Sequence, residues 1–133
     1  MWLSLAAGVA LATGSANPAP RFLALGDSYT IGEGVAAGQD WPYQLAAALR
    51  ARGSAIADPE IVARTGWTTD ELSAAMDEQA FPPHSAIDPL LIGVNNQYRG
   101  RDVNNYRTEF RALLKRAIAL AGGDPPHVVN VSI

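Results

Sequence analysis

Cysteine is absent from this sequence of 133 residues, and histidine occurs only twice. The absence of cysteine excludes disulfides, thiolate catalysis and Cys-based zinc sites, although it does not fix the cellular compartment. The two histidines, His84 and His127, stand apart from each other and have no carboxylates at ligand spacing. We therefore expect no metal site and no cofactor.

Basic residues are also scarce: 10 lysines and arginines face 13 acidic residues, which gives a net charge of −3 and an isoelectric point near 5.2. Nucleic-acid binding needs a basic stripe on the protein surface, so this composition argues against a nucleic-acid partner. Positive charge does gather near the last predicted helix, at Arg99, Arg101, Arg107, Arg111, Lys115 and Arg116. We interpret this group as a solvated helix face, with steering of an anionic head group as the alternative.

The sequence also lacks a hydrophobic run long enough to span a bilayer, which takes roughly 20 apolar residues. Its N-terminal apolar stretch runs only from Trp2 to Ala12, and the small residues Gly14, Ser15 and Ala16 then suit a signal peptidase. We predict a secretory leader over residues 1–20 and a secreted or periplasmic protein. Because the stretch has no basic residue at its start, a misassigned start site or an exposed tail on a cytoplasmic protein is the alternative.

What the sequence does contain is typical of one globular domain, which we place at residues 21–133 and expect to be a monomer. Apolar residues make up 48% and charged residues 17% of the chain, enough to form a core around a single sheet. Short apolar strands are predicted at 22–25, 60–64, 90–94 and 128–133, separated by helices at 41–50, 68–79 and 102–118. This alternation predicts an α/β fold: a three-layer αβα, flavodoxin-like, doubly wound parallel sheet of about four strands.

The first strand leads into a loop rich in hydroxyl groups and glycine, within the stretch from Arg21 to Gly34. Gly26 ends the apolar run and allows a sharp turn, so that Ser28 stands at the carboxyl edge of the sheet beside free backbone N–H groups. A serine in this position is a candidate nucleophile. The alternative is that Ser28 merely caps the segment that follows it.

Two other predicted strands lead into loops suited to the same chemistry. A glycine turn at Gly66 frees a backbone N–H, and Asn95 supplies a side-chain amide. Because ligands bind at the carboxyl ends of parallel strands, Ser28, Gly66 and Asn95 are expected to converge as a nucleophile with an oxyanion hole. The aromatic residues that follow the strand ends are candidates for lining an acyl pocket: Tyr29, Trp67 and Tyr98.

The same residues resemble the sequence blocks of the SGNH, or GDSL, hydrolases, a family of esterases, lipases and other acyl hydrolases. Gly26-Asp27-Ser28 with Gly32 is similar to the first block of the family, Gly66 to the second, and Gly93-Val94-Asn95-Asn96 to the third. The resemblance implies a lysophospholipase-like esterase acting on a small ester or acylated substrate, with Ser28 as nucleophile. It also implies an oxyanion hole made by the backbone N–H groups of Ser28 and Gly66 and the amide of Asn95. The chain departs from the family pattern at Tyr29, where the motif has Leu, and at Asn96, where it has Asp.

The family's fourth block, an Asp-x-x-His that supplies the general base, has no counterpart past the carboxyl end of a predicted strand in this sequence. His84 and His127 each precede a predicted strand, which puts them at the sheet edge opposite Ser28. We therefore expect the 133 residues to be a C-terminally truncated form with little or no ester hydrolysis, and the Asp-x-x-His to lie downstream of Ile133.

Two other functions fit the same residues. A flavodoxin-like binding module would use the hydroxyl groups of Ser28, Tyr29 and Thr30 to cradle a phosphate, with no chemistry. A catalytically inactive fragment or an interaction domain would account for the missing base. Labelling of Ser28 by a fluorophosphonate would argue against the binding module.

Overall fold

Four parallel strands form the centre of the fold. The computed structural model describes residues 17–132, and its strands are β1 (Phe22–Asp27), β2 (Pro59–Arg64), β3 (Asp88–Leu91) and β4 (Val128–Asn130). They are hydrogen-bonded in the order β2-β1-β3-β4. β1 pairs in parallel with β2 on one side and with β3 on the other, so the strand order reverses between β1 and β3. In open α/β sheets such a reversal opens a crevice at the carboxyl ends of the two strands.

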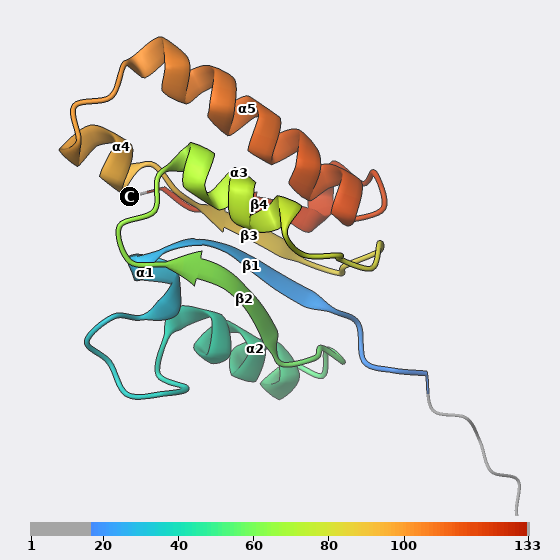
Figure 1. Ribbon diagram of the computed structural model, residues 1–133. Coiled ribbons are helices and arrows are strands. Elements are labelled where there is room, and N and C mark those ends of the chain that lie inside the picture. Colours follow the sequence, from blue (N-terminus) through green and yellow to red (C-terminus); the bar gives the residue numbers. More distant parts are fainter. Residues whose placement is uncertain (1–16, 133) are drawn as a thin grey trace, which may run out of the picture.

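Helices cover both faces of the sheet (Figure 1). α2 (Trp41–Ala51) lies on one face, and α3 (Thr69–Asp77) and α5 (Val103–Leu120) lie on the other. Three shorter helical segments are α1 (Ser28–Ile31), α4 (Val94–Tyr98) and the 3₁₀ turn η1 (Pro125–His127). Since α1 follows β1 and α4 follows β3, both lie at the carboxyl edge of the sheet.

The side chains of β1 alternate between two hydrophobic clusters, one on each face of the sheet. On the face covered by α3 and α5, Leu23 packs in one cluster with Leu72 and Leu113. On the face covered by α2, Phe22 packs in the other cluster with Ala46. Burial on both faces explains why the sequence of this strand is apolar throughout and does not alternate with polar residues.

The structure confirms the predicted fold class, because the order β2-β1-β3-β4 with helices on both faces is that of a flavodoxin-like, doubly wound sheet. It also confirms the predicted helix starts. Asp40 accepts a hydrogen bond from the Tyr43 backbone N–H at 3.2 Å, and Glu71 accepts one from the Thr68 backbone N–H at 2.9 Å. The side chain of Asp102 caps α5 in the same way.

Local predictions differ from the structure at three places. The third strand covers Asp88–Leu91 and not residues 90–94, because Gly93, at φ +135°, turns the chain away from the sheet. The segments after β1 and β3, predicted as loops, form the short helices α1 and α4. The fourth strand covers only Val128–Asn130, at the edge of the sheet, and residues 131 and 132 lie outside it.

The predicted leader, residues 1–20, falls largely outside the described residues and stays a prediction. Residues 17–20 are exposed and have no regular secondary structure. Among the helices within residues 17–132, none combines the length and the apolar character that crossing a membrane requires.

The close packing of α1 against the end of β1 depends on Gly26. A Cβ atom placed on Gly26 would lie 2.1 Å from the Thr30 hydroxyl oxygen and 2.6 Å from the Leu91 carbonyl oxygen. Gly26 is not among the residues with positive φ, so glycine is required here for space and not for backbone conformation. Any larger residue must displace α1, and with it Ser28, from the edge of the sheet.

We expect Gly26→Ala to lower the free energy of unfolding by about 3 kcal/mol, because the added methyl group overpacks a closed contact. The loss should be smaller when the substitution is made in a Thr30→Ala background, where the nearest clashing atom is gone. Urea unfolding of the four chains measures both values. Equal losses in the two backgrounds would show that the contact with Thr30 is not the cause.

Candidate active site

Ser28 is the first residue of α1, directly past the buried end of β1. The residue that caps this helix is Asp27, whose buried side chain accepts a hydrogen bond from the Tyr29 backbone N–H at 3.0 Å. Because the cap is Asp27, capping by Ser28 does not describe this turn. The half-buried Ser28 side chain lines a cavity instead.

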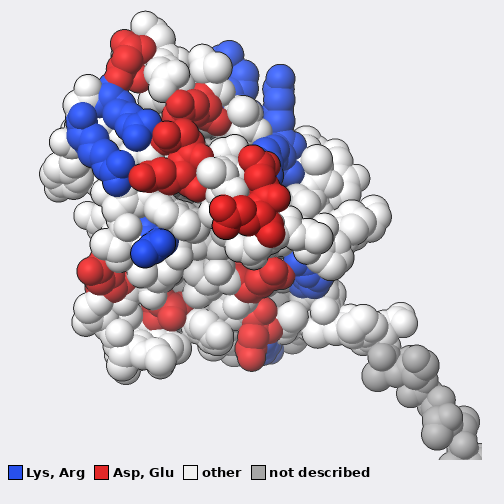
Figure 2. All heavy atoms as spheres, viewed as in Figure 1, with Lys and Arg blue, Asp and Glu red and all other residues white. Residues whose placement is uncertain are grey.

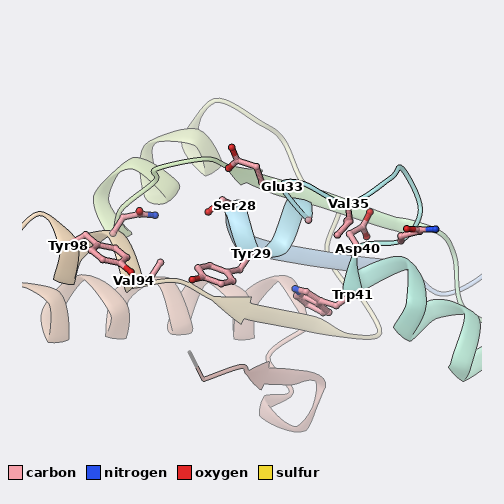
Figure 3. Close-up of a pocket in the computed structure, with 11 residues that line it drawn as sticks. Ser28, Tyr29, Glu33, Val35, Asp40, Trp41, Val94 and Tyr98 are labelled. Carbon is pink, nitrogen blue, oxygen red and sulfur yellow. The ribbon is translucent and has the colours of Figure 1, made fainter.

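The cavity has a volume of about 520 Å³ and lies where the strand order reverses. Its walls come from α1, from the loop that joins α1 to α2, and from α4. Figure 3 shows Tyr29 in the middle of the cavity, with Val94 and Tyr98 on one side and Trp41 on the other. Tyr29 and Tyr98 expose 56% and 81% of their surface, so aromatic area is available to a ligand.

The structure brings four of the six predicted site residues to this cavity: Ser28, Tyr29, Asn95 and Tyr98. Gly66 and Trp67 are not among its lining residues. They form a turn after β2 in which the Trp67 backbone N–H donates to the Arg64 carbonyl at 3.2 Å, and the Trp67 side chain packs against the core. Gly66 has φ +83°, a value that favours glycine, as the predicted glycine turn requires.

Asn95 connects the cavity to this turn and to β1. Its Nδ2 donates a hydrogen bond to the Trp67 carbonyl at 2.8 Å and lies 3.5 Å from Asp27 Oδ2. The first contact is a normal hydrogen bond, whereas the second is at the limit of one. The end of β1, the turn after β2 and the helix after β3 therefore meet at Asn95.

Asn96, the residue at which the chain departs from the family pattern, has a different task. It is buried, and its Oδ1 accepts from the Thr69 backbone N–H at 3.1 Å while its Nδ2 donates to the Thr69 hydroxyl at 2.7 Å. These two bonds join α4 to the start of α3 and satisfy polar groups that are out of contact with water. Asn96 thus fixes the helix that carries Asn95.

Sequence reasoning missed several residues of the cavity wall, namely Glu33, Asp40, Trp41 and Val94. Trp41, the first residue of α2, packs against the hydrophobic cluster under that helix and also lines the cavity. The signal that could have found these residues is topological. A helix that crosses over from β1 to its parallel neighbour must begin at the carboxyl edge, so the first residues of α2 lie near Ser28.

The two histidines lie at the other edge of the sheet, as predicted. His127 is the last residue of η1 and directly precedes β4. His84 precedes β3, and its ring lies against Gly122, beyond the end of α5. Ser28 follows the opposite end of a parallel strand, so neither imidazole is positioned to take its proton. Within residues 17–132 no group of three or more His, Asp or Glu side chains is arranged to hold a metal ion.

Comparison with known proteins decides the family. The profile of the GDSL-like Lipase/Acylhydrolase family matches residues 24–131. The chain belongs to this family. The match confirms the resemblance drawn from the three sequence blocks and favours a GDSL hydrolase over a flavodoxin-like binding module. A search of curated protein sequences gave no match.

Solved structures agree with this assignment. AlinE4, described as an SGNH-hydrolase family esterase, is 26% identical with a TM-score of 0.61, over 77% of this chain and 55% of that one. TesA, at 20% identity and a TM-score of 0.64, matches 76% of this chain and 56% of its own. The psychrotrophic esterase EstA from Pseudoalteromonas sp. is 21% identical with a TM-score of 0.61, over 84% and 57% of the two chains. The likeness to TesA and EstA supports the fold alone. This chain spans a little over half the length of each of the three proteins.

Burial of Asp27 gives the site an unusual carboxyl group. Burial raises the pKa of Asp27 above its ordinary value of 3.8, and the hydrogen bond from the Tyr29 backbone N–H opposes this rise only in part. The folded chain therefore holds the Asp27 proton more tightly than the unfolded chain does. Between the ordinary pKa and the raised pKa, deprotonation costs stability.

Asp27→Asn removes this titration, since an amide does not ionise in this range. As the pH rises above about 4, we expect the unmodified chain to lose stability relative to Asp27→Asn until the raised pKa is passed. Urea unfolding of both chains at a series of pH values measures the difference, and any constant effect of the substitution cancels. A difference that moves in the opposite direction would mean that the pKa of Asp27 is lowered.

Proposed function

We propose that the protein is a serine ester hydrolase in which Ser28 is the nucleophile. The observation that carries the proposal is that Ser28 and Asn95, which follow the neighbouring strands β1 and β3, line one cavity at the point where the strand order reverses. That place is the usual ligand site of doubly wound sheets. Membership of the GDSL family supports the same chemistry.

In the proposed reaction the Ser28 Oγ attacks the carbonyl carbon of an ester while a base takes the hydroxyl proton. The carbonyl π electrons move to oxygen, and the negative charge is held by the backbone N–H groups of Ser28 and Gly66 and by Asn95 Nδ2. The first N–H groups of a helix have no partner within it, which leaves the Ser28 N–H available. Collapse of the intermediate expels the alcohol, whose oxygen takes the proton from the base. Water, deprotonated by the same base, then attacks the acyl-serine, and the proton returns to Ser28 Oγ as the acid leaves.

The contacts of Asn95 suit this role. A primary amide carries two N–H donors, and the 2.8 Å bond to the Trp67 carbonyl occupies one of them. The other faces Asp27 at 3.5 Å, a contact weak enough to be exchanged for a bond to an oxyanion. Asn95 can therefore stay anchored to the turn after β2 while it donates to the substrate.

The walls of the cavity favour an uncharged acyl group. We propose that Tyr29 and Tyr98 contact the substrate, and that Trp67, which packs against the core, acts through its carbonyl by holding Asn95. Two acidic residues, Glu33 and Asp40, line the cavity, and its lining includes no lysine or arginine. A small neutral ester fits this lining better than an anionic one.

The general base remains to be supplied, because both histidines lie at the other edge of the sheet. The one Asp-x-x-His of the sequence, Asp124 to His127, also lies at that edge, so it is not placed to supply the base that the family resemblance implies. An oxyanion hole without a base gives only about 10³-fold acceleration over water, so we expect slow hydrolysis by the 133-residue chain alone. Free imidazole can stand in for the missing side chain, since the cavity is open to solvent.

Ser28→Ala tests the nucleophile. In buffer that contains imidazole, we expect the unmodified chain to hydrolyse p-nitrophenyl acetate at least about 100-fold faster than Ser28→Ala, because only the unmodified chain has a hydroxyl whose proton imidazole can take during attack. Release of p-nitrophenol measures both rates, with imidazole alone as the blank. Equal rates for the two chains would exclude Ser28 as the nucleophile.

Asn95→Ala tests the oxyanion role. We expect the activation barrier to rise by about 3 kcal/mol, and kcat to fall accordingly, with KM little changed, because the lost donor acts on the transition state. Gln97→Ala is the matched control, since Gln97 lies on the same short helix but does not line the cavity. If Asn95→Ala raises only KM, Asn95 binds the substrate and does not stabilise the oxyanion.

A further inference from the structure

Arg99 joins the turn after β2 to the helix that carries Asn95. It follows α4 directly, and its backbone N–H donates to the Asn95 carbonyl at 3.0 Å. Its Nη2 donates to the Gly66 carbonyl at 2.6 Å, and its Nη1 donates to Glu71 Oε1 at 3.3 Å. Arg99 therefore contacts the residues of two of the three proposed oxyanion donors, Asn95 through its backbone N–H and Gly66 through its guanidinium.

We propose that Arg99 is a positioning residue for the oxyanion hole, which it serves by fixing the Gly66 turn at a set distance from Asn95. The inference rests on the proposed function, because it takes Gly66 and Asn95 as the donors. Arg99 touches neither the cavity nor the reacting atoms, since it is not among the residues that line the cavity.

The ion pair of Arg99 with Glu71 does not by itself account for the arrangement. The two side chains expose 45% and 38% of their surface, and exposed pairs contribute little to stability. The bond to Gly66 has a different effect. Glycine at φ +83° has no side chain to restrict the peptide planes on either side of it, so a charged donor on its carbonyl fixes an orientation that sterics leave open.

Arg99 is needed in addition to Asn95, although Asn95 also binds the turn through the Trp67 carbonyl. The Asn95 bond holds the carbonyl of Trp67, whereas the Arg99 bond holds the carbonyl of Gly66 itself. If Asn95 alone held the turn, the orientation of the Gly66 carbonyl would be left without a hydrogen bond of its own. The bond from Arg99 does not depend on the Asn95 amide, so it keeps Gly66 at a fixed distance from Asn95.

Arg101 offers a matched control. Its Nη1 pairs with Asp70 at 2.9 Å, so it also joins the segment after α4 to the first turn of α3. The Gly66 carbonyl accepts from Arg99 and not from Arg101. Figure 2 shows acidic and basic side chains intermixed over the part of the surface where α3, α4 and α5 lie. Removing either arginine therefore deletes one ion pair from the same surface.

In the kinetic test, the rate of each variant is corrected by subtracting the rate of the same variant with Ser28→Ala added, so that only hydrolysis that depends on Ser28 is compared. We expect Arg99→Ala to lower this kcat about 10-fold to 100-fold, as misplacement of a catalytic group does, with KM unchanged within about twofold. Arg101→Ala should change neither value. Arg99→Lys, which keeps one donor for the Gly66 carbonyl, should fall between Arg99→Ala and the unmodified chain. An equal fall of kcat in Arg99→Ala and Arg101→Ala would overturn the inference.

A second measurement does not need activity, so it separates this inference from the proposed function. The Trp67 backbone N–H belongs to the same peptide unit as the Gly66 carbonyl, and its hydrogen exchange reports on that unit. Loss of a bond to a charged donor predicts exchange about tenfold faster in Arg99→Ala, with the amides of Leu23 to Leu25 unchanged. If Trp67 exchanges alike in Arg99→Ala and Arg101→Ala, Arg99 does not position the turn, whether or not Ser28 proves to be the nucleophile.

Discussion

The close approach of backbone to backbone at the end of β1 is the constraint on which the site depends. β1 and β3 are paired at Leu25 and Gly26, and the carbonyl of Leu91 lies where a side chain on Gly26 would have to be. Because Gly26 has no side chain to occupy that space, α1 can fold back directly after β1 and hold Ser28 at the edge of the sheet. The same pairing brings α4, with Asn95, beside α1, so that one contact between strands sets the distance between Ser28 and the Asn95 amide.

Buried polar groups form a second layer behind this edge. Asp27, Thr69 and Asn96 are almost completely buried, yet all three are hydrogen-bonded: Asp27 caps α1, and Asn96 joins α4 to Thr69 at the start of α3. Burial of polar groups costs free energy unless they are paired, and paired groups in a place of low dielectric constant hold one geometry strongly. The short helices α1 and α4 are thus held at this edge by polar contacts as well as by the hydrophobic core, which lies deeper between the sheet and its helices.

The long elements could be predicted from sequence because local signals and tertiary packing agree there. Asp40 and Asp102 cap helices that also carry apolar faces, and the strand from Phe22 is apolar because both of its faces are covered. The short helices α1 and α4 could not be predicted in the same way. Helices of four or five residues are unstable alone, and these form because Asp27 and Asn96 hold them to the rest of the fold.

In the candidate site, too, the sequence indicates which residues follow a strand but not which way their side chains point. Asn95 and Asn96 are adjacent and chemically identical, and as residues of a loop they would be interchangeable candidates for the oxyanion hole. In a helix, neighbours point about 100° apart, so α4 directs Asn95 to the cavity and Asn96 into the buried contact with Thr69. The family resemblance chose Asn95 from its position in the block. The structure adds the physical reason: a helix of one turn, held at its buried side by the amide of Asn96, presents the amide of Asn95 to the cavity.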